Sequence, residues 1–198
     1  MSEAPILLNL GSGRRGARLP AYFDAWRQLR IDCDPEVEPD LVANITDLSA
    51  IAAESADAVW SSHCIEHLFR HEIGLALAEM QRVLKNDGFA CILVPDLQAI
   101  ARFVVADRLD EIMYVSPAGP VTAHDALYGF GPALERGKVQ MAHRSGFTPG
   151  AMTHQLRQAK FANFVVRRRP SLELAAVARK TPWSDRGEYE ALLRQLDL

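Results

Sequence analysis

A short apolar run that leads directly into a glycine-rich turn most constrains the fold of this chain. Ile6–Leu10 is followed at once by Gly11-Ser12-Gly13-Arg14-Arg15-Gly16, which has G-x-G-x-x-G spacing. The run predicts a buried strand, and the glycines let the backbone approach a ligand closely. Asp32 lies 19 residues after Gly13, at the end of the next predicted strand. A carboxylate there can accept hydrogen bonds from both hydroxyls of a ribose.

Short apolar runs alternate with helical patterns through the first half of the chain. We expect further strands at Leu29–Cys33, Pro39–Asn44, Ala56–Ser61 and Phe89–Val94. We expect helices at Leu19–Leu29, Glu72–Leu84 and Leu97–Ala106, with Asn86-Asp87-Gly88 ending the second of them. Continuous apolar strands between helices are typical of a parallel sheet covered on both faces.

The pattern changes after Ala106. Residues 107–146 contain three prolines and five glycines and read as irregular. A long irregular stretch in a compact domain is often a lid or binding element. We therefore expect one domain over residues 1–198, with residues 107–146 as an inserted lid or substrate segment.

The C-terminal part predicts a helix, two strands and a last helix. Thr148 is placed to cap a helix over Thr148–Phe161, with Pro149 at its first position. The strands Asn163–Arg168 and Leu172–Ala178 are joined by a connection so short that they must be antiparallel. Glu188–Leu196 is the predicted terminal helix.

Composition narrows the class of protein. The 198 residues include 22 basic and 25 acidic side chains, a net charge of −3 that does not favour a general nucleic-acid or anionic-membrane binder. Cys33, Cys64 and Cys91 cannot all pair within the chain and fit the reduced thiols of a cytoplasmic protein. We find neither the basic start of a signal peptide nor an apolar stretch near the roughly 20 residues of a membrane span.

Five segments resemble the successive motifs of a known family. They are ILLNLGSG, LRIDCDP, ANITDLSAI, DAVWSSHCIEHL and EMQRVLKNDGFACILVPDL. In order and spacing they resemble class I S-adenosylmethionine-dependent methyltransferases, in particular the small bacterial type 11 enzymes, over roughly residues 5–98. The resemblance implies a Rossmann-like, doubly wound α/β fold: a mostly parallel seven-stranded sheet with a C-terminal antiparallel strand pair and helices on both faces.

The same resemblance implies that S-adenosylmethionine is the cofactor and S-adenosylhomocysteine the product. Gly11 and Gly13 resemble the glycines beneath the methionine part of the cofactor, and Asp32 resembles the ribose-binding acid. Asn44 and Ile45 resemble the pair at the adenine edge. The full set of cofactor-binding residues that it implies is Asn9, Gly11, Ser12, Gly13, Asp32, Asn44, Ile45, Ser61 and Ser62. Asn9 and Asn44 stand where the family commonly has acids, so they keep an acceptor oxygen but lose a charge.

The implied reaction is methyl transfer to an unidentified small-molecule acceptor. His124, Tyr128 and His143 are the candidate catalytic residues on the substrate side, because all three lie in residues 107–146. A neutral histidine can take a proton from a hydroxyl or amine. Each of the three also has an ordinary surface or packing interpretation.

The run His63-Cys64-Ile65-Glu66-His67 has the H-x-x-E-H spacing of some zinc peptidases. On a helix, His63 and His67 would share a face with His71 one turn further on. The run follows a buried strand where the methyltransferases have a similar Glu-His pair, which favours a structural role. We therefore expect no metal site.

Two other functions remain open. A nicotinamide-dependent oxidoreductase would share the glycine turn and Asp32, but no lysine stands at Tyr-x-x-x-Lys spacing. A catalytically silent binding module with the methyltransferase fold is kept open by Asn9 and Asn44. We also consider a homodimer, in which a second subunit helps to cover the substrate.

Overall fold

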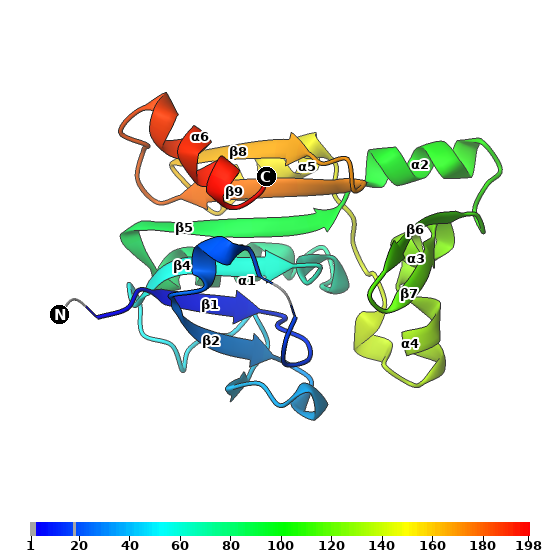
Figure 1. The fold of residues 1–198 in the computed structure, drawn as a ribbon, viewed down its shortest axis with the longest axis horizontal. Helices are drawn as coiled ribbons and strands as arrows, with labels where there is room; N and C mark the ends of the chain where they lie inside the picture. The colour runs from blue at the N-terminus through cyan, green and yellow to red at the C-terminus, as the bar shows by residue number, and fades with distance from the viewer. Residues whose placement is uncertain (1–2, 18) are drawn as a thin grey trace.

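The computed structural model describes residues 3–17 and 19–198, and a seven-stranded sheet forms its centre (Figure 1). The strand order is β3-β2-β1-β4-β5-β9-β8. β1 to β5 are parallel, whereas β9 is antiparallel to both β5 and β8. The strands are β1 (Ile6–Leu10), β2 (Arg27–Asp32), β3 (Leu41–Val42), β4 (Ala56–Ser62), β5 (Leu84–Pro95), β8 (Asn163–Arg168) and β9 (Glu173–Arg179). The predicted fold class and the antiparallel pair are confirmed.

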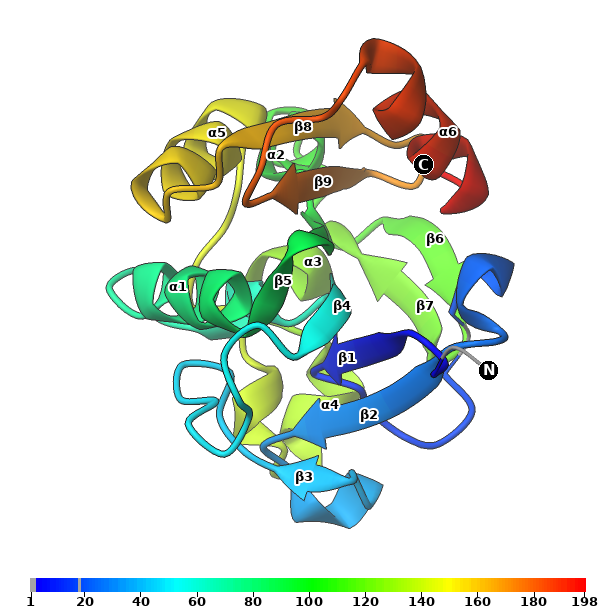
Figure 2. The ribbon, with the colours of Figure 1, turned by 90° about the vertical axis from the view of Figure 1, so that its left-hand side faces the viewer.

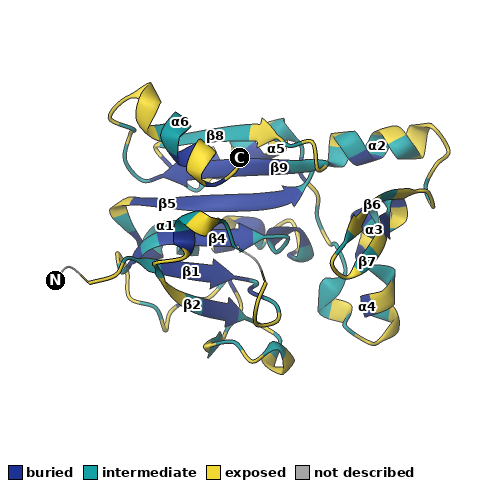
Figure 3. Ribbon diagram, in the orientation of Figure 1, coloured by how far each residue is buried: buried dark blue, intermediate teal, exposed yellow. Residues whose placement is uncertain are grey.

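Helices cover both faces of the sheet (Figure 2). α1 (Ile73–Val83) and α5 (Pro149–Gln158) pack on one face, and α6 (Arg186–Gln195) packs on the other. Leu77, Ile92 and Leu156 lie in the core beneath α1 and α5, whereas Trp60 and Leu193 lie in the core beneath α6. The inner strands are buried along most of their length (Figure 3), as their continuous apolar sequence predicts.

Residues 107–146 are more regular than the sequence suggested. After α2 (Leu97–Val105) come the hairpin strands β6 (Ile112–Ser116) and β7 (Gly119–Thr122), then α3 (Ala123–Tyr128) and α4 (Gly131–Glu135). Figure 1 shows this group beyond the carboxyl ends of the parallel strands. Its helices are only five or six residues long, too short for helical periodicity to be visible in the sequence.

The predicted helix Leu19–Leu29 is wrong. The structure has a single 3-10 turn at Ala21–Phe23, and β2 already begins at Arg27. The aromatic side chains that suggested a helical face form a cluster on the sheet instead. The ring centroids of Phe23 and Trp26 lie 5.2 Å apart, and those of Phe23 and Trp60 lie 5.9 Å apart. Tertiary packing of aromatic rings therefore overrides the local periodicity.

The predicted turn at Asn86-Asp87-Gly88 is also wrong. α1 ends at Val83, and β5 spans Leu84–Pro95, with a shift in its register against β4 between Leu84 and Phe89. A Cβ atom on Gly88 would lie 2.9 Å from the carbonyl oxygen of Asp57, so the glycine is required by a close approach of two strands. Lys85 strengthens this contact, because its Nζ lies 2.7 Å from Asp57 Oδ1.

Within residues 3–17 and 19–198, no helix combines the length and apolar character needed to cross a membrane.

Candidate functional site

The glycine-rich turn lies at the carboxyl end of β1. Gly11 and Gly13 have φ angles of +65° and +58°, in the left-handed region that favours glycine. A Cβ atom on Gly11 would lie 2.5 Å from Cys64 Sγ, so no side chain fits there. The turn is also held to β2, since the N–H groups of Gly11 and Ser12 both donate to the carbonyl of Ile31.

Asp32 ends β2 beside this turn. Its Oδ2 accepts from the N–H of Gly13 at 2.9 Å, and its Oδ1 accepts from the N–H of Asp34 at 2.9 Å. Each carboxylate oxygen keeps a second lone pair for a ligand. Asp32 therefore shapes the turn as well as lining the cleft beside it.

Arg30, which the sequence did not single out, connects two loops of the site. Its guanidinium donates to the carbonyl oxygens of Gly13 at 2.5 Å, Glu38 at 2.7 Å and Val37 at 3.1 Å. The residue is buried, which is unusual for arginine and marks it as a structural connection. A single strand arginine carries no sequence signal that predicts this role.

A cleft of 240 Å³ opens between the turn, the end of β2 and the residues after β3. Ligands of open α/β sheets bind at this carboxyl edge. Residues 138–144 close the cleft from the opposite side. There Lys138 Nζ lies 2.8 Å from Asp34 Oδ2, and Gln140 Nε2 donates to the same oxygen at 3.0 Å. The hydrogen bond from Lys138 holds the pKa of Asp34 below its usual value.

Five of the nine predicted cofactor-binding residues line the cleft: Gly11, Gly13, Asp32, Asn44 and Ile45. The other four, Asn9, Ser12, Ser61 and Ser62, lie on or directly after the ends of β1 and β4. Ser12 and Ser61 are buried, and neither hydroxyl has a hydrogen-bond partner among the described residues. Asn44 uses its Oδ1 to accept from the N–H of Thr46 at 3.1 Å.

A larger cavity of 860 Å³ adjoins the cleft, and the two share His63, His67 and Met141 in their walls. Most of its lining comes from α2, the β6–β7 hairpin and the loop between β8 and β9. The apolar residues of this lining are Pro95, Phe103, Met113, Val115, Pro117, Ala118, Val121, Ala126, Phe130, Met141, Pro170 and Leu172. Such a cavity suits an apolar small molecule with few polar groups.

The segment after β4 carries a partly buried ion-pair cluster, in which Glu66 is the buried member. His63 lies between two carboxylates, with Nε2 2.6 Å from Glu173 Oε1 and Nδ1 3.3 Å from Glu66 Oε1. Burial acts to lower the pKa of His63, but the two carboxylates outweigh it and raise the pKa to about 10. Burial likewise acts to raise the pKa of Glu66, but His63 holds it below the ordinary value. His63 is therefore a cation at neutral pH and cannot act as a base.

Two further histidines face this cluster. The rings of His67 and His143 contact each other edge to face, with centroids 4.9 Å apart. His67 ends the 3-10 turn Ile65–His67, whereas His143 belongs to the distant segment after α4. Burial lowers the pKa of His143, so its ring is neutral at pH 7. Within the H-x-x-E-H run, Ile65–His67 form a 3-10 turn, so the run is not the α-helix that a zinc-peptidase site would need.

The three predicted catalytic residues do not lie together. His143 lines the large cavity, whereas His124 and Tyr128 lie on exposed positions of α3 and are absent from the lining of the cleft and of the cavity. The rings of His124 and Tyr128 contact each other, with centroids 5.1 Å apart.

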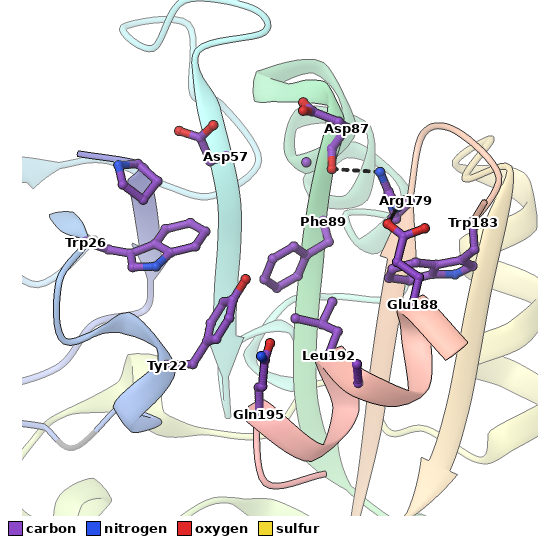
Figure 4. A pocket seen from close by; sticks show the side chains of 13 residues that line it. Tyr22, Trp26, Asp57, Asp87, Phe89, Arg179, Trp183, Glu188, Leu192 and Gln195 are labelled. Atoms are coloured by element: carbon purple, nitrogen blue, oxygen red, sulfur yellow. Dashed lines mark hydrogen bonds and ion pairs between the residues drawn. The ribbon is translucent and has the colours of Figure 1, made fainter. Parts of the chain in front are cut away.

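Another hollow of 430 Å³ lies at the opposite edge of the sheet, near the amino ends of β4 and β5 (Figure 4). Tyr22, Trp26 and Phe89 form one wall, and Trp183 lies on the other side. Arg179 crosses its rim and donates to the carbonyl of Asp87 at 3.0 Å. This hollow is separate from the glycine turn and results from the packing of α6 against the aromatic cluster.

Part of the chain is similar to a known protein family. Residues 11–92 match the family model described as a methyltransferase domain. A search of curated proteins gives no match. The predicted resemblance to methyltransferases is therefore confirmed over residues 11–92.

Solved structures share the fold at low sequence identity. A 1,6-didemethyltoxoflavin-N1-methyltransferase of Burkholderia thailandensis is 20% identical with a TM-score of 0.54, and the match covers 90% of this chain and 72% of that one. A SAM-dependent methyltransferase of Methanosarcina mazei is 15% identical with a TM-score of 0.58, covering 92% and 95%. One from Archaeoglobus fulgidus is 13% identical with a TM-score of 0.58, covering 89% and 86%. The Burkholderia structure contains 1,6-didemethyltoxoflavin and S-adenosylhomocysteine.

Proposed function

We propose that the protein binds S-adenosylmethionine in the cleft beside Gly11 and Asp32 and transfers its methyl group to a small molecule in the 860 Å³ cavity. The main support for this proposal is that the cleft and the cavity adjoin each other. His63, His67 and Met141 line both, so a cofactor in the cleft and an acceptor in the cavity would meet there. Methyl transfer requires such an in-line approach of the acceptor to the methyl carbon.

The residues of the cleft fit this cofactor. Asp32 offers free carboxylate lone pairs where a ribose would lie, and the glycine turn admits a ligand close to the backbone. The buried hydroxyls of Ser12 and Ser61 have no partner among the described residues, and a polar ligand would satisfy them. Asn44 keeps one lone pair of Oδ1 and its amide N–H groups for an adenine edge.

When bound, the sulfonium cofactor supplies both the methyl group and its leaving group. The chain then has to bind, orient and exclude water. Residues 107–146 supply the cover over the carboxyl edge of the sheet, which supports the predicted role as a substrate segment. His143 is the predicted catalytic residue that its position supports best, because it is neutral and lines the acceptor cavity.

The apolar lining supports an acceptor that is itself largely apolar and carries one nucleophilic group. The Burkholderia enzyme is crystallised with the small molecule 1,6-didemethyltoxoflavin, which agrees with a small-molecule substrate here.

A blocking variant tests this arrangement. Ala118 lies exposed at the tip of the β6–β7 hairpin and lines the acceptor cavity. We expect Ala118→Trp to fill the cavity, leave S-adenosylmethionine affinity unchanged and reduce the release of S-adenosylhomocysteine across a panel of apolar alcohols, phenols and amines. Ala106→Trp, at an exposed position outside the cavity lining, is the control. Turnover that is equal in both variants would contradict the assignment of the cavity.

A further inference from the structure

We propose that Glu66, His67 and His143 form a site for a divalent transition-metal ion, with Zn²⁺ as the first candidate. One nitrogen of each ring and one carboxylate oxygen of Glu66 lie within 4.8 Å of one another. Two imidazoles and one carboxylate are a donor set that holds Zn²⁺ or Fe²⁺ in enzymes while leaving coordination positions open.

Glu66 gives an independent reason for a cation. Its side chain is 1% exposed, and neither carboxylate oxygen accepts a hydrogen bond from the described residues. A buried charge without such bonds is costly. Its charge partner is His63, whose Nδ1 lies 3.3 Å from Oε1. A metal ion at Oε2 would complete the surroundings of the carboxylate.

The two histidines are oriented as metal ligands usually are. His67 Nδ1 lies 3.2 Å from the carbonyl oxygen of Ala142, and His143 Nδ1 lies 2.9 Å from that of Ala126. These contacts assign the ring N–H to Nδ1 and leave a lone pair on Nε2. Backbone carbonyls that fix the tautomer in this way are a regular feature around metal-binding histidines.

The backbone brings the two halves of the site together. The N–H groups of Arg144 and Ser145 donate to the carbonyl of Glu66 at 2.9 and 3.1 Å, which places His143 beside the 3-10 turn. Glu66 and His143 also line a void of 20 Å³, large enough for one water-sized occupant. With Zn–N bonds of about 2.1 Å the ligand atoms lie about 3.4 Å apart, so each must move inward by less than about 1 Å.

The position of the metal site beside the acceptor cavity suggests a role in activating the acceptor. His67 and His143 both line the acceptor cavity, so an open coordination position can be reached from there. A hydroxyl oxygen of an acceptor bound to the ion would lose its proton to bulk water more readily. This use rests on the proposed methyl transfer, whereas metal binding itself does not. A metal ion in this role would favour acceptors with a hydroxyl group. His143 would then be a metal ligand rather than a base.

Metal titration of the full chain tests the site. We expect calorimetry with Zn²⁺ to give a stoichiometry of one, and Co²⁺ to give visible d–d absorption without the thiolate charge-transfer band that Cys33 or Cys64 would add. His143→Ala and, because an alanine can disturb packing, the isosteric Glu66→Gln should each weaken Zn²⁺ binding at least tenfold. His124→Ala, at an exposed histidine on α3, should bind like the unchanged protein. Circular dichroism establishes that each variant is folded.

Three results would overturn the proposal: no Zn²⁺ binding by the unchanged chain, equal affinity in folded Glu66→Gln, or a thiolate signature with Co²⁺. S-adenosylmethionine binding is titrated separately in the same samples. A failure of the metal site and a failure of the proposed methyltransferase function are therefore seen independently.

Discussion

His63 Nε2 lies 2.6 Å from Glu173 Oε1, and this ion pair joins the segment after β4 to the start of β9 across the intervening strand β5. The pair fixes one wall shared by the cofactor cleft and the acceptor cavity. His63 has a φ angle of +49°, a backbone conformation that is uncommon for a residue other than glycine. The carboxylates of Glu173 and Glu66 stabilise the side chain in this position.

We expect Glu173→Gln to lower the free energy of unfolding by about 1 kcal/mol, because the His63 ring is 38% exposed and solvent weakens the pair. The folded-state pKa of His63 is raised to about 10 from 6.5. Its contribution is therefore complete below about pH 6.5 and is lost as the pH rises toward 10. Urea unfolding of both metal-free proteins at pH 6 and pH 10 measures this difference. A difference that grows with pH would contradict the assignment.

We expect Gly11→Ala to destabilise the turn by more than its positive φ angle alone would cause. The added Cβ would meet Cys64 Sγ at 2.5 Å, so we expect a loss of stability of at least about 1–3 kcal/mol and weaker cofactor binding. Gly16→Ala is the matched control, because Gly16 has φ +85° but no atom within 4 Å of the added Cβ. Thermal unfolding and cofactor titration of the two variants separate the steric clash with Cys64 from the strain of a positive φ angle. Equal losses of stability in the two variants would rule out the clash.

Arg30→Met removes three charge-assisted hydrogen bonds to backbone carbonyls. We expect an unfolding free energy lower by about 2–4 kcal/mol, since the carbonyls lose their donors. Arg27→Met, at an exposed position on the same strand, should change it by less than about 0.5 kcal/mol. Denaturant unfolding distinguishes the two, and similar values would show that Arg30 does not hold the loops.

Lys138→Met should loosen the segment that closes the cleft, because Lys138 contacts both Asp34 and Glu36. The lysine is a surface group, so the expected loss of cofactor affinity is no more than about fivefold and diminishes at high salt. Arg136→Met, at an exposed position before it, is the control. Calorimetric titrations at two salt concentrations measure the effect. An effect that is independent of salt would contradict an electrostatic tether.

The sequence predicted the parts of the fold that depend on local pattern. Continuous apolar runs identified the sheet, and Thr148-Pro149 identified the start of α5. The helix expected at Leu19–Leu29 failed because Tyr22, Phe23 and Trp26 pack on distant residues of the sheet. Periodicity reports which side chains are apolar but not what they contact.

Only part of the candidate site could be predicted from the sequence. Asp32 and the glycine turn follow a motif with a physical meaning, so their place in the cleft could be expected. The cluster around Glu66 could not, because Glu173 and His143 come from segments 107 and 77 residues away in sequence. Spacing within His63–His67 suggested His71 as a third ligand, whereas the fold brings His143 to Glu66 and His67.

The proposed function depends on binding of S-adenosylmethionine in the cleft beside Gly11 and Asp32. Calorimetric titration with S-adenosylmethionine, S-adenosylhomocysteine and NADH tests it most directly, using the unchanged chain, Asp32→Asn and the exposed control Asp47→Asn. We expect micromolar binding of both sulfur ligands, weakened at least tenfold by Asp32→Asn only, and no binding of NADH. Binding of NADH alone, or of none of the three, would contradict it and favour an oxidoreductase or a silent binding module respectively.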